Sequence, residues 1–260
     1  MDQLPLISII TPSLNQAGFI ERTITSVLTQ NYPNLEYYVI DGGSTDGTIN
    51  ILHEKGNSLQ WISEPDRGQA NAINKGLSRV KGEIICYLNS DDELAPGSLR
   101  IVGEFFRRHP QAAWLTGRCK TINKQGQEVR RAITIYKDLW LLLRSRKVLL
   151  VLNYISQPAT FWRRTIIDEV GIFDEDLHYV MDYDYWLRIS NRYPLWIVPS
   201  ILAYFRIHPF SKSGSTSHAQ FEEELDVARR YTKSSILLML HQLHKSIAIQ
   251  VYRRMIKEQQ

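Results

Sequence analysis

The N-terminal part of the chain, up to about residue 110, alternates short apolar runs with stretches in which apolar residues recur every three or four positions. Four runs are short and apolar enough for strands, at residues 6–11, 35–41, 60–63 and 83–89. Four segments have the spacing of amphipathic helices, at residues 18–30, 45–53, 69–80 and 96–107. This alternation predicts βαβ units, and therefore an α/β fold with a mostly parallel sheet flanked by helices.

The alternation weakens after about residue 112. The pattern there predicts strands at 112–118 and 158–162, a hairpin arm at 128–136, and helices at 163–170 and 183–191. From residue 221 onward apolar residues again step by three or four, at Ile236, Leu240, Leu243, Ile247 and Val251. The chain should therefore carry a C-terminal amphipathic helical extension.

The net charge of +4 and the pI of about 9.0 come from this extension. Residues 227–260 contain seven lysines and arginines and one glutamate, so the rest of the chain is slightly acidic. A nucleic-acid-binding protein carries its basic surface on the domain that reads the nucleic acid. The charge distribution therefore predicts no nucleic-acid partner.

Three features favour a cytoplasmic location. Cys86 and Cys119 form no spacing motif, which fits a reducing compartment. Residues 1–3 begin neither the basic nor the apolar region of a signal peptide. No apolar run approaches the roughly 20 residues that span a bilayer.

Polar residues gather at the carboxyl ends of the four predicted N-terminal strands, in the segments 11–13, 41–44, 64–68 and 89–92. Ligands of open parallel sheets bind beyond the carboxyl ends of the strands. We therefore expect these segments to form one site. Asp41 begins a turn that lacks the G-x-G-x-x-G order, so a dinucleotide fingerprint is not supported, and the turn could serve only as a helix cap.

Asp91 and Asp92 follow the most apolar strand, and two adjacent carboxylates repel each other unless something neutralises them. Mg²⁺ and Mn²⁺ prefer one or two carboxylates together with substrate phosphates. The pair therefore indicates a divalent metal site. The alternative is a solvated turn or a helix cap before Pro96.

Taken in order, seven segments resemble family 2 of the inverting glycosyltransferases, whose fold is GT-A. The segments are ISIITPSLN at 7–15, VIDGGSTDGT at 39–48, SEPDRGQANAINKG at 63–76, GEIICYLNSDDEL at 82–94, SQPATFWRR at 156–164, GIFDE at 171–175 and MDYDYWLRI at 181–189. The resemblance extends over roughly residues 5–215. It implies transfer of a sugar, with inversion, from a UDP-, dTDP- or GDP-linked donor to the hydroxyl of a saccharide or lipid-linked acceptor, in polysaccharide or glycolipid synthesis.

The resemblance assigns the donor site to three groups of residues. The loop that holds the nucleotide base corresponds to Thr11, Pro12, Ser13 and Asn15. Asp41 matches the acid near the base and ribose, and Gly42 replaces the second aspartate that is more common there. Asp66 and Arg67 correspond to positions that contact the base or the diphosphate.

The resemblance also implies a metal site for Mn²⁺ or Mg²⁺. Asp91 and Asp92 match the last two positions of the acidic metal-binding motif, and Asn89, counted with the donor site, stands at the first. One of the two aspartates should bind metal and the other ribose, with the assignment open. His208, followed by Ser211, Ser213 and Ser215, resembles the loop that closes over the donor, which implies a metal or diphosphate role. The alternative is a structural or exposed histidine.

Asp182 matches the catalytic base of the family, and it stands just before a predicted helix whose N-terminus favours a carboxylate. Met181 occupies a position that is often acidic in relatives. Asp182 could instead be a helix N-cap, and Asp184 is a competing candidate for the base.

These assignments divide the chain into a GT-A domain at 1–217 and a basic amphipathic extension at 218–260. Within the domain, residues 1–110 should bind the nucleotide sugar and residues 111–217 the acceptor. The extension could pack on the domain, pair with a second protomer, or lie on the inner face of an anionic membrane, and residues 140–152 could face the same bilayer.

Two other functions remain compatible with the sequence. A sugar-1-phosphate nucleotidyltransferase also binds nucleotide and metal on a related sheet, although residues 12–15 lack its glycine-rich basic loop. A non-catalytic sugar-binding module is the second, although the three candidate catalytic and metal-binding aspartates are all present.

Overall fold

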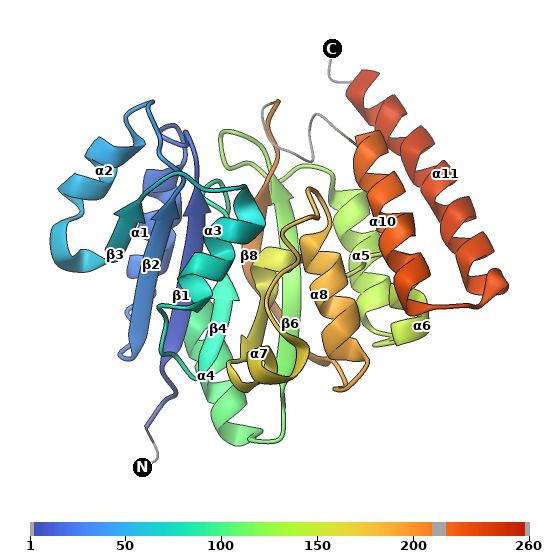
Figure 1. Cartoon of the computed structure of the whole chain (residues 1–260), viewed down its shortest axis with the longest axis horizontal. Helices are drawn as coiled ribbons and strands as arrows, with labels where there is room; N and C mark the ends of the chain where they lie inside the picture. The colour runs from blue at the N-terminus through green and yellow to red at the C-terminus, as the bar shows by residue number, and fades with distance from the viewer. Residues whose placement is uncertain (1–2, 210–216, 258–260) are drawn as a thin grey trace.

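A computed structural model describes residues 3–209 and 217–257 of the protein (Figure 1). Eight strands form a single sheet in the order β3-β2-β1-β4-β7-β6-β8-β5. The strands are β1 (Ile7–Ser13), β2 (Leu35–Asp41), β3 (Gln60–Ser63), β4 (Ile84–Tyr87), β5 (Glu93–Leu94), β6 (Trp114–Ile122), β7 (Thr160–Arg163) and β8 (Trp196–Arg206).

The first four strands in the order are parallel, as the alternating pattern predicts. β1 lies between β2 and β4, and its apolar residues Ile7, Ile9 and Ile10 are fully buried. Ser13 pairs with Asp41, and Asp41 pairs with Ser63, so the carboxyl ends of β1, β2 and β3 lie level at one edge. This register brings three of the polar segments together.

The second half of the sheet is mixed. β7 runs antiparallel to both β4 and β6, β8 runs parallel to β6, and β5 closes the edge antiparallel to β8. Neither β5 nor β8 is predicted by the pattern. The predicted hairpin arm at 128–136 is wrong, because most of it belongs to the helix α5 (Arg131–Leu141). Only an isolated bridge between Ile122 and Glu128 remains of that pairing.

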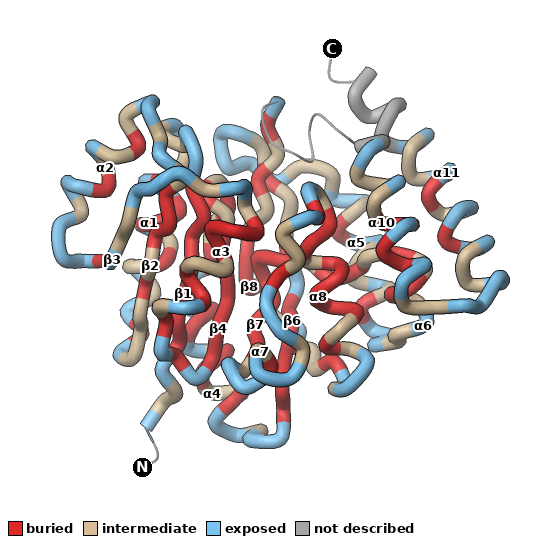
Figure 2. The backbone as a smooth tube through the Cα atoms, in the orientation of Figure 1, coloured by how far each residue is buried: buried red, intermediate tan, exposed pale blue. Residues whose placement is uncertain are grey.

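Helices cover both faces of the sheet, and each face has its own apolar core (Figures 1 and 2). One core takes buried residues from α1 (Ile20–Leu28), α2 (Thr48–Glu54) and α4 (Ser98–Arg108). The other takes them from α3 (Gln69–Leu77), α5, α6 (Arg146–Leu149), α7 (Thr165–Val170) and α8 (Met181–Ser190). α4 begins two residues after Pro96 rather than at it.

The C-terminal extension forms two helices, α10 (Ser217–Tyr231) and α11 (Ser235–Lys257). α10 packs against α8, and its Val227 and Ala228 are fully buried in the same core as that helix. α11 lies on the outer side of α10, at the end of the molecule farthest from β3 (Figure 1). Across the described residues, every helix is too short or too polar to cross a membrane.

Candidate active site

The carboxylate of Asp41 organises the loop after β2. It is fully buried, and Oδ2 accepts hydrogen bonds from the backbone N–H groups of Gly43 at 3.0 Å and Ser44 at 2.8 Å. Oδ2 also accepts a hydrogen bond from the hydroxyl of Ser63 at 2.7 Å. Asp41 therefore joins the ends of β2 and β3 and holds the turn that follows.

Asn15 joins the loop after β1 to the same turn. It has a positive φ of 53°, its N–H donates to the hydroxyl of Ser44 at 2.7 Å, and its Oδ1 accepts from the N–H of Thr45 at 2.9 Å. Thr11 and Ser13 are buried in β1, and the hydroxyl of Thr11 lies 3.1 Å from that of Tyr37. The residues of the first two loops that were expected at the donor site are thus held together by direct contacts.

Asp66 occupies the space beside Gly42. A Cβ atom on residue 42 would lie 2.4 Å from Oδ2 of Asp66, so the side chain of Asp66 stands next to the backbone position where the family resemblance implies a second aspartate. Oδ1 of Asp66 accepts from the N–H of Gly68 at 2.8 Å. Arg67 is mostly exposed and its guanidinium donates to Glu175 at 2.5 Å.

Asp91 and Asp92 have different surroundings. Asp92 is fully buried, its Oδ1 accepts from the N–H of Arg206 at 2.8 Å, and its Oδ2 accepts from Asn89 Nδ2 at 3.3 Å. Asp91 is partly exposed, and its Oδ2 lies 3.1 Å from Nε2 of His208. The strand β8 supplies Arg206 and leads directly to His208, so the end of this strand gives the two aspartates different partners.

Burial changes the pKa values of the charged groups around this pair. Burial raises the pKa of Asp92 well above its ordinary value, and the neighbouring Asp91 raises that pKa further. The fully buried Arg206 donates from Nε to the Asp91 carbonyl at 2.9 Å and forms an ion pair with Glu93. Burial lowers the pKa of Arg206. The buried guanidinium of Arg206 thus holds the Asp91–Asp92 turn in place.

Asp91 and His208 fit a divalent metal. One carboxylate oxygen and one imidazole nitrogen converge at the strand ends, and the ring of His208 stacks on Phe19 at 4.4 Å between centroids. Within the described part of the chain, no three His, Cys, Asp or Glu side chains are arranged so that they could hold a metal ion together. Two protein ligands suit a metal that completes its coordination with substrate phosphates and water. Ser211, Ser213 and Ser215 lie outside the described residues.

Asp182 lies in the first turn of α8, because the helix begins at Met181 and Val180 is its N-cap. The alternative that Asp182 is the N-cap is therefore wrong. Asp182 is half-buried, and burial raises its pKa, whereas the nearby Lys137 opposes that rise. Its charge also acts on Tyr87 at the end of β4. Asp182 thus lies near the strand that leads to Asn89 and Asp91.

Asp184 has a structural role. It is 3% exposed, and its carboxylate accepts from Nε of Arg188 at 2.9 Å and from the hydroxyl of Tyr231 at 2.6 Å. Both oxygens are therefore engaged within the protein. This arrangement favours Asp182 over Asp184 as a group that could reach a substrate.

The sequence pattern missed the contribution of α10. The carboxylate of Glu223 accepts from the N–H groups of His178 at 2.9 Å, Tyr179 at 2.7 Å and Val180 at 3.0 Å, directly before α8. Glu224 is buried, and its charge interacts with those of Asp182 and Lys137. The acidic run at 222–224 was visible, but its position opposite α8 depends on the tertiary fold.

Glu224 makes stability depend on pH. Burial raises its pKa from 4.5 to about 7, and the negative charge of Asp182 also raises it. The folded state therefore holds this proton more tightly than the unfolded chain, so the free energy of unfolding falls as the pH rises from 4.5 to about 7. We expect Glu224→Gln to remove this fall and to be more stable than the wild type in mildly alkaline buffer, by about 2–3 kcal/mol.

Urea unfolding of both proteins across this pH range would measure the difference. Asp226→Asn, an exposed carboxylate on the same helix, is the matched control and should keep the wild-type pH dependence. A Glu224→Gln protein whose stability falls with pH as steeply as the wild type would assign the effect to another group.

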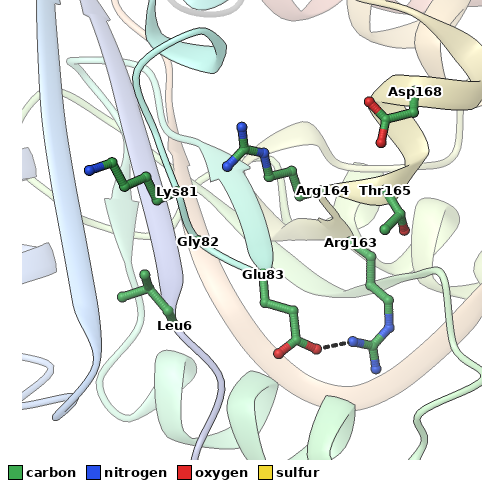
Figure 3. Close-up of a pocket in the computed structure, with 8 residues that line it drawn as sticks. All are labelled: Leu6, Lys81, Gly82, Glu83, Arg163, Arg164, Thr165 and Asp168. Atoms are coloured by element: carbon green, nitrogen blue, oxygen red, sulfur yellow. Dashed lines mark hydrogen bonds and ion pairs between the residues drawn. The ribbon is translucent and has the colours of Figure 1, made fainter.

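A cavity of about 450 Å³ lies away from these residues (Figure 3). Its lining includes Leu6, Gly82 and Glu83, which precede β1 or β4, and Arg163 at the end of the antiparallel β7. It therefore opens at the amino ends of the parallel strands, opposite the cluster of acids. Arg163 and Glu83 form an ion pair in its wall.

Comparisons with known proteins show what the chain resembles. A family model described as glycosyl transferase family 2 matches residues 8–171. A glycosyltransferase of Rickettsia felis, uncharacterised, is 29% identical over 231 residues, or 86% of this chain and 37% of that protein. A poly-beta-1,6-N-acetyl-D-glucosamine synthase of Staphylococcus epidermidis is 27% identical over 179 residues, or 67% of this chain and 43% of that protein. The chain spans less than half the length of either relative.

Two solved structures share the fold. S. aureus TarS 1-349 in complex with UDP-GlcNAc has a TM-score of 0.69 and 19% identity, over 88% of this chain and 67% of that one. The mannosyltransferase PcManGT from Pyrobaculum calidifontis, in complex with GDP-Man and Mn²⁺, has a TM-score of 0.68 and 20% identity, over 97% of this chain and 74% of that one. The predicted α/β fold of GT-A type, with helices after it, is confirmed.

Proposed function

The chain belongs to glycosyl transferase family 2, and on this premise we propose that it is a metal-dependent inverting enzyme that moves a sugar from a nucleoside-diphosphate donor to an acceptor hydroxyl. The observation that carries the proposal is the placement of two features at the carboxyl end of β4. The Asp91–His208 pair follows this strand, and the charge of the half-buried Asp182 acts on Tyr87, the last residue of the strand. Attack by an acceptor hydroxyl on the carbon that bears the diphosphate requires a base and a metal site at the same strand end.

The strand tips supply the donor site in this proposal. The buried segment Thr11–Ser13, with Asn15 and Asp41, would surround the base and ribose, and Asp66 would supply the carboxylate that Gly42 lacks. The exposed Arg67 would meet the diphosphate. The complexes of TarS with UDP-GlcNAc and of PcManGT with GDP-Man support a nucleotide-sugar donor of this kind.

Asp182 acts as the general base. It accepts the proton of the acceptor hydroxyl while that oxygen forms a bond to the anomeric carbon, and the bond from this carbon to the diphosphate oxygen breaks on the opposite face. The electron pair of that bond leaves with the nucleoside diphosphate, so the configuration inverts. A bound Mn²⁺ or Mg²⁺, held by Asp91 and His208, would supply Lewis-acid stabilisation of the leaving diphosphate.

Asp92 and Asn89 support this site without a direct role in the reaction. Asp92 is tied to the backbone of Arg206, and Asn89 accepts from Gln69 Nε2 at 2.6 Å. The resemblance to a poly-beta-1,6-N-acetyl-D-glucosamine synthase supports polysaccharide synthesis as the setting, with a saccharide or lipid-linked acceptor.

A donor panel tests the proposal. The melting temperature of the protein should be measured with UDP-, dTDP- and GDP-sugars, with and without Mn²⁺. Donors with one of the three bases should raise it strongly, and only when the metal is present. The same donor should then release nucleoside diphosphate when an acceptor is added. Release of pyrophosphate from a nucleoside triphosphate and a sugar phosphate would instead show a nucleotidyltransferase.

A further inference from the structure

Exposed apolar side chains concentrate on two helices of the described chain. Of the fourteen large apolar residues that are exposed, eleven belong to α5, the turn after it, or α11. Leu139 is 61% exposed, Leu142 71% and Met239 63%. Figure 2 shows the outer side of α11 exposed along the part whose side chains are described. Scattered single apolar residues are normal on a protein surface, but a concentration of this kind marks an interaction site.

An aromatic contact joins the exposed apolar sides of the two helices. The exposed positions of α11 recur every three or four residues, at Met239, Leu243 and Ile247, and so lie on one side of the helix. The ring of His244 beside this stripe stacks on Tyr136 of α5, with 6.3 Å between centroids and 3° between planes. We call these exposed apolar residues of segment 135–143 and of α11 the α5–α11 face.

Basic residues accompany the α5–α11 face and acids are scarce. Apart from Lys137, which lies on the other side of α5, segment 129–151 holds five lysines and arginines and one acid, Asp138, which is paired with Arg118. α11 holds no acid up to residue 251, and its Lys245 is paired with Glu222 of α10. Arg144 and Lys147 are exposed next to the apolar residues. A symmetric pair of chains would bring these like charges together, whereas an anionic lipid surface would neutralise them.

We propose that the α5–α11 face docks the protein on an anionic lipid bilayer. Leu139, Leu142 and Leu243 enter the boundary between headgroups and acyl chains, and Arg144 and Lys147 contact the anionic headgroups. This docking is independent of the reaction, and it goes beyond the established family membership.

Docking also orients the catalytic site, and this step rests on the proposed function. α5 carries Lys137 on the side away from the α5–α11 face, where its charge interacts with those of Asp182 and Glu224. The acceptor side of the site therefore adjoins the helix that contacts the bilayer. The acceptor that this geometry suits is a saccharide attached to a lipid in the same membrane.

Vesicle flotation tests the docking. The full chain should bind vesicles of phosphatidylcholine with phosphatidylglycerol, and bind phosphatidylcholine alone much more weakly. Leu139→Glu combined with Leu243→Glu should weaken binding by at least about tenfold for each leucine, because buried apolar area is lost. Both side chains are exposed, so the variant should fold normally, and circular dichroism would verify this. Ile172→Glu, which removes an exposed apolar residue outside the face, is the control and should bind as the wild type does.

Charge reversal gives an independent measurement. Arg144→Glu with Lys147→Glu should weaken binding to the anionic vesicles by about fivefold for each residue and reduce its dependence on salt. Equal vesicle binding by the wild type and by both double variants would overturn the proposal. Absence of vesicle binding together with a dimer that Leu139→Glu and Leu243→Glu abolish, seen by sedimentation velocity, would overturn it in favour of a second copy.

The outcome is separable from that of the proposed function. Vesicle binding requires neither donor nor metal, so an absence of sugar transfer would leave the docking result intact. Conversely, the double-leucine variant should retain full transfer to a water-soluble acceptor and lose transfer to a lipid-linked acceptor in vesicles.

Discussion

Asp182→Asn should abolish sugar transfer, lowering kcat by about 10²–10⁴-fold while leaving donor affinity nearly unchanged. The amide keeps the shape of the side chain in the first turn of α8 but cannot accept the acceptor's proton. Single-turnover transfer and calorimetric donor binding would measure the two effects separately. Because burial raises the pKa of Asp182 above 3.8, the acid limb of kcat/KM in the wild type should lie above that value, and activity is lost as the pH falls through the raised pKa.

Asp184→Asn is the matched comparison on the same helix. Its carboxylate is bound to Arg188 and Tyr231, so the loss of charge should lower the free energy of unfolding by about 2–4 kcal/mol, with a much smaller effect on kcat at temperatures where the variant is folded. A folded Asp184→Asn protein without activity, beside an active Asp182→Asn protein, would make Asp184 the base.

The convergence of the strand tips could be predicted from periodicity. Short apolar runs separated by helical segments fix a parallel sheet, and parallel strands deliver their carboxyl ends to one edge. Asp41 ends one of these strands and Asp91 follows another, and both lie at the same edge of the sheet, as the pattern predicts. Periodicity could not show that Asp91 and Asp92 have different surroundings. Their partners, His208 and Arg206, lie more than one hundred residues further along the chain.

β8 escaped prediction because Pro199 interrupts its apolar run, and proline lacks the N–H that a central strand donates. In the structure, a register shift in the pairing of β6 with β8 accommodates the proline. Thr116 pairs with Ile197 and Arg118 with Ile201, so Pro199 lies in an irregular stretch of the strand. A bulge of this kind accommodates a proline. Sequence pattern alone does not reveal it.

The hairpin arm predicted at 128–136 failed for the opposite reason. Ile133, Thr134 and Ile135 are β-branched and favour a strand locally. In the structure Thr134 and Leu141 are buried on one side of a helix, and that helix is completed by the leucine-rich segment that the pattern left unassigned. Burial of an amphipathic face outweighs local preference. The part of the chain proposed to bind the acceptor was therefore the hardest to predict from the sequence.

Asp91→Asn should remove most metal-dependent donor binding and lower transfer by about 10²-fold or more, because a neutral amide is a much weaker ligand for a hard divalent cation. Donor binding should be titrated at several Mn²⁺ concentrations. The variant should need a higher Mn²⁺ concentration than the wild type to bind the donor. His208→Ala should shift it in the same direction by a smaller amount, since a neutral imidazole contributes less to holding the ion than a carboxylate.

Asp92→Asn provides the contrast. Asp92 is fully buried and burial raises its pKa, and an amide oxygen can still accept from the Arg206 N–H, so this variant should keep the wild-type metal dependence. A shift in metal dependence for Asp92→Asn, with none for Asp91→Asn, would exchange the roles of the two residues. In the proposed site, the partly exposed Asp91 beside His208 is the carboxylate that would contact the metal, and the buried Asp92 would hold the turn in place.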